Sequence, residues 1–331
     1  MTNRKKLLAA VILLLAAAGT GFILKGKSSA GQPEAKQQNK KITIASSASG
    51  FISFPYYVAQ KKGFFSQNGL DVEFKQMETS VSAQALLAGD IDYSPFITGV
   101  ISASQNGFPA KILLALSEKS SNFLVGQAGA DLKDLKTLGV SQPFGPQHYQ
   151  ALELIDRDAP SAKILFLKGA SGVRAQIIAK AIDAGIVSAA AAFQLEDKGF
   201  KILKSLQGEN LVDGGLVTTD DKIKNEPEEI RKVIAAVRSA INFIKTDPAQ
   251  TQEMLLDYYS FEKNDANKKI TEKIYQVAKE YFLADGLPQE SSVINSMRFA
   301  KSADTESFAD INGKTISQEN IAKSFNFEFL K

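Results

Sequence analysis

The feature that most constrains the fold is the alternation of short apolar, β-branched runs with stretches bounded by helix signals. Runs typical of strands cover residues 41–45, 70–74, 91–94, 110–116, 137–141, 162–167, 186–193 and 200–203. Helix patterns lie between them, at residues 55–61, 81–88, 99–105, 147–155 and 173–182. Parallel strands need crossover connections, usually helices. The alternation therefore predicts an α/β fold with mixed, mostly parallel sheets and helices on both faces.

After Gly214 and Gly215 the pattern changes to longer helices. Apolar residues recur at helical spacing through residues 228–245, with Pro227 before the stretch and Pro248 after it. Two further helices are predicted at residues 251–259 and 264–282. One continuous apolar stripe on each helix indicates packing against a core rather than chemistry.

The first forty residues have the composition of a targeting segment. Three basic residues precede an apolar run over residues 7–24, which predicts an export signal within residues 1–30. Small residues at Ala16 and Ala18, or at Ser28 and Ala30, suit cleavage, whereas 18 residues also reach the lower limit for an uncleaved membrane anchor. Residues 31–40 are polar and predict a linker, so the folded part should begin near Lys41.

Charge and composition exclude several classes of function. Eight of the 39 Lys and Arg residues and one of the 36 Asp and Glu residues lie in residues 1–41, so the remainder carries a net charge of about −4. With this charge balance, no basic patch indicates that the chain binds nucleic acid. Cysteine is absent and His148 is the one histidine, which excludes Cys nucleophiles, Cys/His zinc sites and histidine-based triads. We expect no catalytic constellation, no metal site and no cofactor.

A set of motifs follows in a fixed order along the chain. KGFF stands at residues 62–65, GLDVE at 69–73 and ALLAGDID at 85–92, and NGFPA, DLKDL, PEE and DP follow at 106–110, 131–135, 227–229 and 247–248. In order and spacing they resemble the solute-binding proteins of the nitrate, taurine, alkanesulfonate and thiamine-pyrimidine class, over nearly residues 42–300. The chain departs from that pattern at Ser188, where the family carries an acidic residue, and at Gln194, where it carries proline.

The resemblance implies a type II periplasmic-binding fold with two α/β lobes, two crossings between them and ligand in the cleft. We place lobe one at residues 41–122 and 215–331 and lobe two at residues 123–214. Hinge motion is expected near residues 120–126 and 213–216. Such a chain would act outside the cytoplasm, in the periplasm where there is one. It would deliver a small polar or anionic organic ligand to an ABC permease, as a monomer and not as an enzyme.

Ligands of doubly wound sheets lie beyond the carboxyl ends of the strands, where loops enter helices. Four segments of this chain meet that description: residues 46–56, 95–99, 142–148 and 169–174. With Gln194, they supply the candidate ligand-binding residues Ser47, Phe51, Phe54, Tyr56, Thr98, Gln147, His148 and Arg174. Phe51, Phe54 and Tyr56 could equally be core aromatics, and Thr98 could be a helix N-cap.

An anion is the sharpest ligand hypothesis from these segments. Backbone N–H groups at a helix start favour negative charge, and Arg174 could grip an oxyanion with two hydrogen bonds. His148 could add a further contact. The alternatives are that Arg174 lies on the surface and that His148 is merely exposed. The acidic runs at residues 220–221 and 226–229 are expected to be solvated faces.

Two other functions stay open at this point. Some relatives of the family make pyrimidine or menaquinone precursors, so an enzyme on the same fold is one alternative. The other is a membrane-tethered sensor that passes its closed state to a receptor, which a retained anchor within residues 1–30 would favour.

Overall fold

A computed structural model describes residues 39–47, 50–143, 145–208, 210–301 and 316–331. The predicted signal or anchor over residues 1–30, and the linker as far as residue 38, lie outside the described residues. The described residues, which begin at residue 39, belong to one compact unit. Its first element, strand β1, begins at Lys40, one residue before the predicted start of the folded part.

The amino-terminal part of this unit alternates strands and helices as predicted. In chain order its elements are β1 (Lys40–Ser46), α1 (Phe54–Lys61), α2 (Phe64–Gln67), β2 (Leu70–Gln76), α3 (Thr79–Ala88), α4 (Thr98–Gln105) and β3 (Ala110–Ser117). β1 and β2 pair in parallel, with Ile42 opposite Val72. Both of these side chains are buried, which fixes the register because a slip by one residue would expose them.

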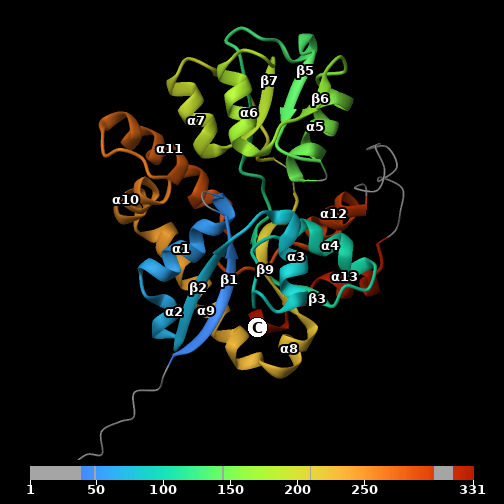
Figure 1. The fold of residues 1–331 in the computed structure, drawn as a ribbon, viewed down its shortest axis with the longest axis vertical. Helices are drawn as coiled ribbons and strands as arrows, with labels where there is room; N and C mark the ends of the chain where they lie inside the picture. The colour runs from blue at the N-terminus through green and yellow to red at the C-terminus, as the bar shows by residue number, and fades with distance from the viewer. Residues whose placement is uncertain (1–38, 48–49, 144, 209, 302–315) are drawn as a thin grey trace, which may run out of the picture. The chain divides into compact units, whose positions relative to one another are not determined.

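A five-stranded sheet occupies the middle of the chain, in the order β6-β5-β7-β4-β8. Its strands are β4 (Asn122–Gly126), β5 (Thr137–Val140), β6 (Lys163–Phe166), β7 (Ala184–Ser188) and β8 (Lys201–Ser205). Helices α5 (Pro146–Arg157), α6 (Gly169–Ile178) and α7 (Ala189–Asp197) pack against it, as Figure 1 shows in green and yellow-green. All five strands lie within residues 122–205.

The carboxyl-terminal part begins with β9 (Asp213–Thr219), which pairs antiparallel with β3. The helices that follow are α8 (Asp220–Asn225), α9 (Pro227–Thr246), α10 (Pro248–Tyr258), α11 (Asp265–Tyr281), α12 (Glu290–Lys301) and α13 (Gln318–Ser324). The predicted stripe of α9 is confirmed, since these residues are at most 2% exposed: Ile230, Val233, Ile234, Val237, Ile241 and Ile244.

The sheets are mixed, as predicted, but they are not mostly parallel, since the named strands make three parallel and three antiparallel pairings. The strand predicted over residues 186–193 is wrong beyond residue 188, where the chain forms a helix. The apolar run over residues 186–193 leaves the sheet at Ser188 and continues as α7. Its four successive alanines are strong helix formers, and an apolar run alone does not separate a buried strand from a buried helix.

Three further segments differ from the sequence prediction. Residues 91–94 form only isolated bridges, Tyr93 to Ile44 and Ser94 to Val217, instead of a full strand. Both expected hinge segments hold strands, β4 and β9, so the connections that cross between the sheets are residues 118–121 and 206–212.

Candidate functional site

One pocket lies where both crossing connections meet. Its lining residues are Ile97, Thr98, Ile101, Ser120, Pro146, Gln150, Leu211, Val212, Asp213 and Ser296. Its empty volume is about 460 Å³, open solvent included. We call it the crossing pocket. Because α4 and α12 supply one side and α5 another, residues of both predicted lobes form its walls.

Local sequence positions these walls. Helix α5 begins at the pocket, with Gly145 as its N-cap and Pro146 as its first residue, where a missing N–H leaves no helical hydrogen bond unmade. Asp213 opens β9 and is followed by Gly214, which has a φ of +68°. A Cβ on Gly214 would lie 2.8 Å from Ile52 Cγ2, so the backbone beside the pocket requires glycine.

The neutral polar groups of the crossing pocket also hold the crossings in place. Gln150 Oε1 accepts a hydrogen bond from Asn122 Nδ2 at 2.9 Å, and Ser120 Oγ accepts one from Asn122 N at 3.0 Å. Ser296 Oγ accepts one from Val212 N at 2.7 Å. These contacts tie α5 to the first crossing through Asn122, and α12 to the second crossing.

Asp213 is the one charged side chain among the residues that line this pocket in the described ranges. Its Oδ2 accepts a hydrogen bond of 2.8 Å from the hydroxyl of Tyr281, at the end of α11. Burial raises the pKa of the Asp213 carboxyl to about 6, against the opposing effect of the Tyr281 hydrogen bond. The pKa of Tyr281 is raised well above its ordinary value, first by burial, so it remains a protonated donor.

The predicted aromatic residues lie in the core rather than on the pocket. Phe51, Phe54 and Tyr56 are 4%, 0% and 1% exposed. The Phe51 ring lies 5.1 Å from that of Tyr281 and therefore supports the residue that holds Asp213. The Tyr56 hydroxyl donates to Gly215 O at 2.5 Å, beside the start of β9. These three side chains are therefore core aromatics that pack beside the pocket, which is the alternative stated in the sequence analysis.

Ser47 and Thr98 have different positions. The backbone N–H of Ser47 donates to Ser53 Oγ at 3.2 Å, which draws together the two ends of the loop that follows β1. Thr98 is the predicted site residue that does line the crossing pocket. It is the first residue of α4, and the N-cap is Ile97, so the N-cap alternative for Thr98 is wrong.

Gln147 and His148 lie in the first turn of α5, as the loop pattern predicted. Gln147 Oε1 accepts a hydrogen bond of 3.2 Å from Ser141 N and so closes the loop before the helix. The His148 ring lies 5.0 Å from the Phe166 ring of β6. Neither residue lines the crossing pocket, although Pro146 and Gln150 of the same helix do.

Arg174 and Gln194, predicted separately, are brought together. Arg174 Nη1 donates to Gln194 Oε1 at 3.0 Å, which joins α6 to α7. Helix α6 begins at Gly169, four residues before the predicted start, so Arg174 lies beyond the first turn. Its side chain is exposed and does not line the crossing pocket. A ligand contact by either residue stays a prediction.

Sequence reasoning missed most of the pocket. Ser120 and Asp213 were placed at the hinges without a ligand role, and Ser296 belongs to α12, which the pattern did not predict. Gln150 lies one turn beyond the predicted loop, and α-helical spacing from Pro146 would have placed it on the same face. No signal in the sequence marked the carboxylate of Asp213, because its importance depends on contacts with distant residues.

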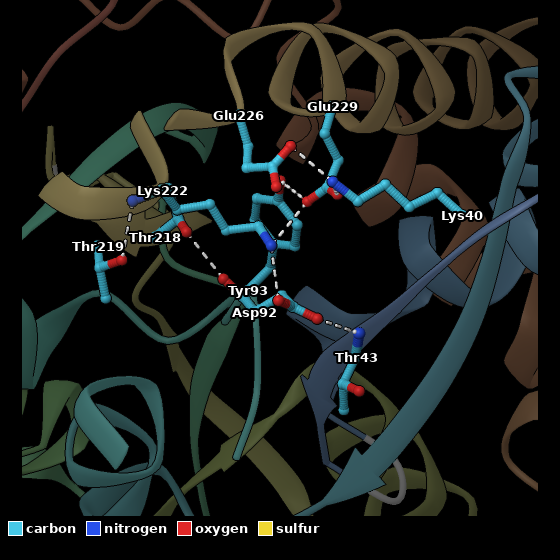
Figure 2. A network of polar contacts seen from close by, with 9 residues as sticks. All are labelled: Lys40, Thr43, Asp92, Tyr93, Thr218, Thr219, Lys222, Glu226 and Glu229. Atoms are coloured by element: carbon cyan, nitrogen blue, oxygen red, sulfur yellow. Dashed lines mark hydrogen bonds and ion pairs between the residues drawn. The ribbon is translucent and has the colours of Figure 1, made fainter. Parts of the chain in front are cut away.

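A second polar cluster surrounds the buried Glu229 (Figure 2). Glu229 is 3% exposed, and its Oε1 lies 2.8 Å from Lys222 Nζ. The Tyr93 hydroxyl donates to the same oxygen at 2.7 Å. Lys40 Nζ lies 2.7 Å from Oε2 and 2.6 Å from Glu226 Oε2. The expectation that residues 226–229 form a solvated face is therefore wrong for Glu229, because α9 turns this carboxylate inward toward two lysines.

Asp92 extends this cluster toward β1. Its Oδ1 lies 2.6 Å from Lys222 Nζ, and its Oδ2 accepts a hydrogen bond of 2.7 Å from Thr43 N. We call Lys40, Asp92, Tyr93, Lys222, Glu226 and Glu229 the Glu229 cluster. Burial raises the pKa of Glu229, but contacts with two lysines and a tyrosine outweigh it and leave the pKa below its ordinary value. The cluster joins β1 to α8 and α9 and has the character of a structural network.

Across the described ranges, no group of three or more His, Cys, Asp or Glu side chains could hold a metal ion. Among the helices of those ranges, none combines the length and the apolar character needed to cross a bilayer.

Comparison with known proteins adds independent findings. The family model described as NMT1/THI5 like matches residues 51–251. Riboflavin-binding protein RibY of Chloroflexus aurantiacus is 24% identical over 247 residues, which cover 68% of this chain and 68% of that protein. The 4-amino-5-hydroxymethyl-2-methylpyrimidine phosphate synthase THI11 of Saccharomyces cerevisiae is 24% identical over 251 residues, covering 69% and 72%.

Solved structures resemble this chain over most of its length. The alkanesulfonate-binding protein SsuA of Xanthomonas axonopodis pv. citri, bound to MOPS, matches with a TM-score of 0.66 at 14% identity. The match covers 83% of this chain and 94% of that chain. At this identity the likeness shows the fold, which is that of periplasmic binding proteins. The predicted fold class is confirmed.

Proposed function

The chain belongs to the NMT1/THI5-like family, and from that premise we propose that it is the solute-binding component of an ABC importer. It would capture a small polar organic ligand outside the cytoplasm. The observation that carries the proposal is the crossing pocket, because its walls come from both predicted lobes and from both connections between them. A ligand there would contact the segments that any hinge motion must bend.

The chemistry of the pocket supports binding. Apolar side chains of Ile97, Ile101, Leu211 and Val212 form much of its wall, with a few polar groups among them. Small-molecule sites have this composition, in which apolar walls supply affinity and a few polar groups fix orientation. The name of one relative, a riboflavin-binding protein, is in keeping with such a role.

An enzyme is the second candidate, because relatives in yeast are named pyrimidine phosphate synthases at the same level of identity. Against it stand the absence of cysteine and the single histidine, which leave few groups for acid–base or nucleophilic chemistry. The export signal predicted within residues 1–30 also favours transport. We propose a permease as the partner and a monomer as the working form.

The experiment is a ligand search with a turnover control. Native mass spectrometry of the purified chain would reveal a co-purified ligand. Thermal unfolding with sulfonates, carboxylates, amines, pyrimidines and flavins would reveal added ones, since a ligand at 100 times its Kd stabilises by about 2.7 kcal/mol. The proposal expects a stabilising compound that is recovered unchanged after incubation. Conversion of that compound into a product would support the enzyme instead.

A further inference from the structure

The crossing pocket holds a negative charge and, within the described ranges, no positive one. Asp213 is its single charged lining residue. Arg174, the cation expected to meet an anionic ligand, is instead exposed and donates to Gln194. The charge on the wall is therefore opposite to the one expected from the sequence.

The carboxylate of Asp213 is held in place by a rigid aromatic support. Tyr281 donates to its Oδ2, and the Tyr281 ring packs edge-on against Phe51 at 5.1 Å and Phe282 at 4.9 Å. All three aromatic side chains are at most 4% exposed. Groups that recognise ligands need such preorganised support, because a side chain fixed beforehand loses little freedom on binding.

Asp213 also has acceptor capacity left for a ligand. An ionised carboxylate offers about four acceptor positions on its two oxygens. In the part of the chain that the structure describes, the side-chain hydrogen bond to this carboxylate comes from Tyr281 alone. With a pKa raised to about 6 by burial, the carboxyl is mostly ionised at pH 7.5. A partly buried anion with one neutral donor favours a cation beside it.

We propose that Asp213 is the specificity-determining residue of the crossing pocket and that the ligand presents a protonated amine or another cationic nitrogen to its carboxylate. The inference rests on the proposed function, since it names the ligand chemistry of that same pocket. Ser120, Gln150 and Thr98 line the same walls and would orient the remainder of the ligand. An anionic group at the Asp213 end would instead meet a like charge in a partly desolvated site.

The test compares matched compounds that differ in one group. Butylamine, butanol and butyrate form one set, benzylamine, benzyl alcohol and benzoate a second, and 3-aminopropanesulfonate with propanesulfonate a third. Binding to the purified chain at pH 7.5 is measured by calorimetry or by ligand-observed NMR. In each set that binds, we expect the amine to bind at least 10-fold more tightly than its neutral or acidic counterpart.

The variant Asp213→Asn removes the charge and keeps an oxygen that accepts from Tyr281. We expect it to bind the amines at least 10-fold more weakly with its fold retained in circular dichroism. The matched control Asp90→Asn alters an exposed aspartate outside the pocket and should bind them as the wild type does.

Two outcomes contradict the account in different ways. Carboxylates, sulfonates or neutral compounds that bind the wild type and Asp213→Asn equally would overturn the role of Asp213 and leave solute binding intact. A chain that binds no compound and carries no co-purified ligand would contradict the proposed function as well.

Discussion

The carboxylates of Glu229 and Asp213 both lie in partly or fully buried surroundings, but the groups that contact them differ. Glu229 is met by Lys222 at 2.8 Å, Lys40 at 2.7 Å and the Tyr93 hydroxyl at 2.7 Å. Among the described residues, Asp213 is met by one neutral donor, the Tyr281 hydroxyl, and it lines the crossing pocket. The pKa of Glu229 lies below its ordinary value, whereas burial raises that of Asp213 to about 6.

The difference separates a structural charge from one available to a ligand. Where two lysines surround a carboxylate, its charge is compensated within the fold and removing it harms stability. Where one hydroxyl holds a carboxylate at a pocket wall, the fold carries a charge that a ligand can compensate. Residues that serve binding commonly lower stability in this way.

The largest effect on the free energy of unfolding is expected from Glu229→Gln. The change removes the buried carboxylate that Lys222 and Lys40 share and leaves Lys222 with Asp92 as its remaining anion. Removing one partner of a buried ion pair costs about 3–5 kcal/mol. Urea unfolding measures the loss, and ligand affinity should not change. The control Glu228→Gln alters an exposed neighbour of α9 and should shift stability by less than about 0.5 kcal/mol. Equal effects of both variants would contradict the structural role.

The pH dependence of stability should have opposite signs at the two carboxylates. Asp213 has a raised pKa, so the fold favours its protonated form. The stability of that form is fully present below about pH 3.8 and is lost as the pH rises through about 6. Asp213→Asn should therefore gain roughly 2–3 kcal/mol relative to the wild type between pH 4 and pH 8. Tyr281 is the titratable group in contact with it and stays protonated over this range.

Glu229 has a lowered pKa, so its contribution is present above about pH 4.5 and is lost as the pH falls through its folded pKa. Urea unfolding of the wild type, Asp213→Asn and Glu229→Gln from pH 3 to pH 8 separates the two contributions. Three parallel profiles would remove the distinction between the carboxylates.

A smaller effect is expected from Tyr281→Phe. It removes the hydroxyl that donates to Asp213 and should lower stability by about 1.5–2 kcal/mol, at the lower end of the range for a hydrogen bond to a charged group. Because that hydrogen bond lowers the pKa of Asp213, its loss should raise the midpoint of the Asp213 titration. An unchanged midpoint would show that the hydroxyl does not act on the carboxyl.

The smallest effect on stability belongs to Arg174→Gln. Arg174 is exposed and contacts Gln194 at the surface, so unfolding should change by less than about 0.5 kcal/mol. Ligand affinity of the same variant tests the anion site predicted from the sequence. A loss as large as that of Asp213→Asn would favour that site over the crossing pocket.

Local pattern predicted much of the fold. The strands at residues 41–45 and 70–74, the helix over α9 and the end of a helix at residue 88 were all found where sequence signals placed them, since periodicity, proline and glycine act over short distances. The run over residues 186–193 was misread because a short apolar run suits a buried strand or a buried helix.

The candidate site was less predictable, for a physical reason. The pocket joins residues as far apart as Ile97 and Ser296, and the character of Asp213 depends on Tyr281, 68 positions away. Thr98 was identified because it begins a helix after a strand-like segment. The acidic run at residues 226–229 was predicted to be a solvated face, because a charged run does not reveal which of its members α9 turns inward.

The measurement that tests the central comparison most directly is a titration of the side-chain carboxyls by ¹³C NMR, with assignments from Asp213→Asn and Glu229→Gln. The account predicts a midpoint near 6 for Asp213 and one below 4.5 for Glu229. An amine that binds in the pocket should lower the Asp213 midpoint and leave that of Glu229 unchanged. A midpoint for Asp213 at or below about 4 without ligand, unmoved by a bound compound, would contradict the account.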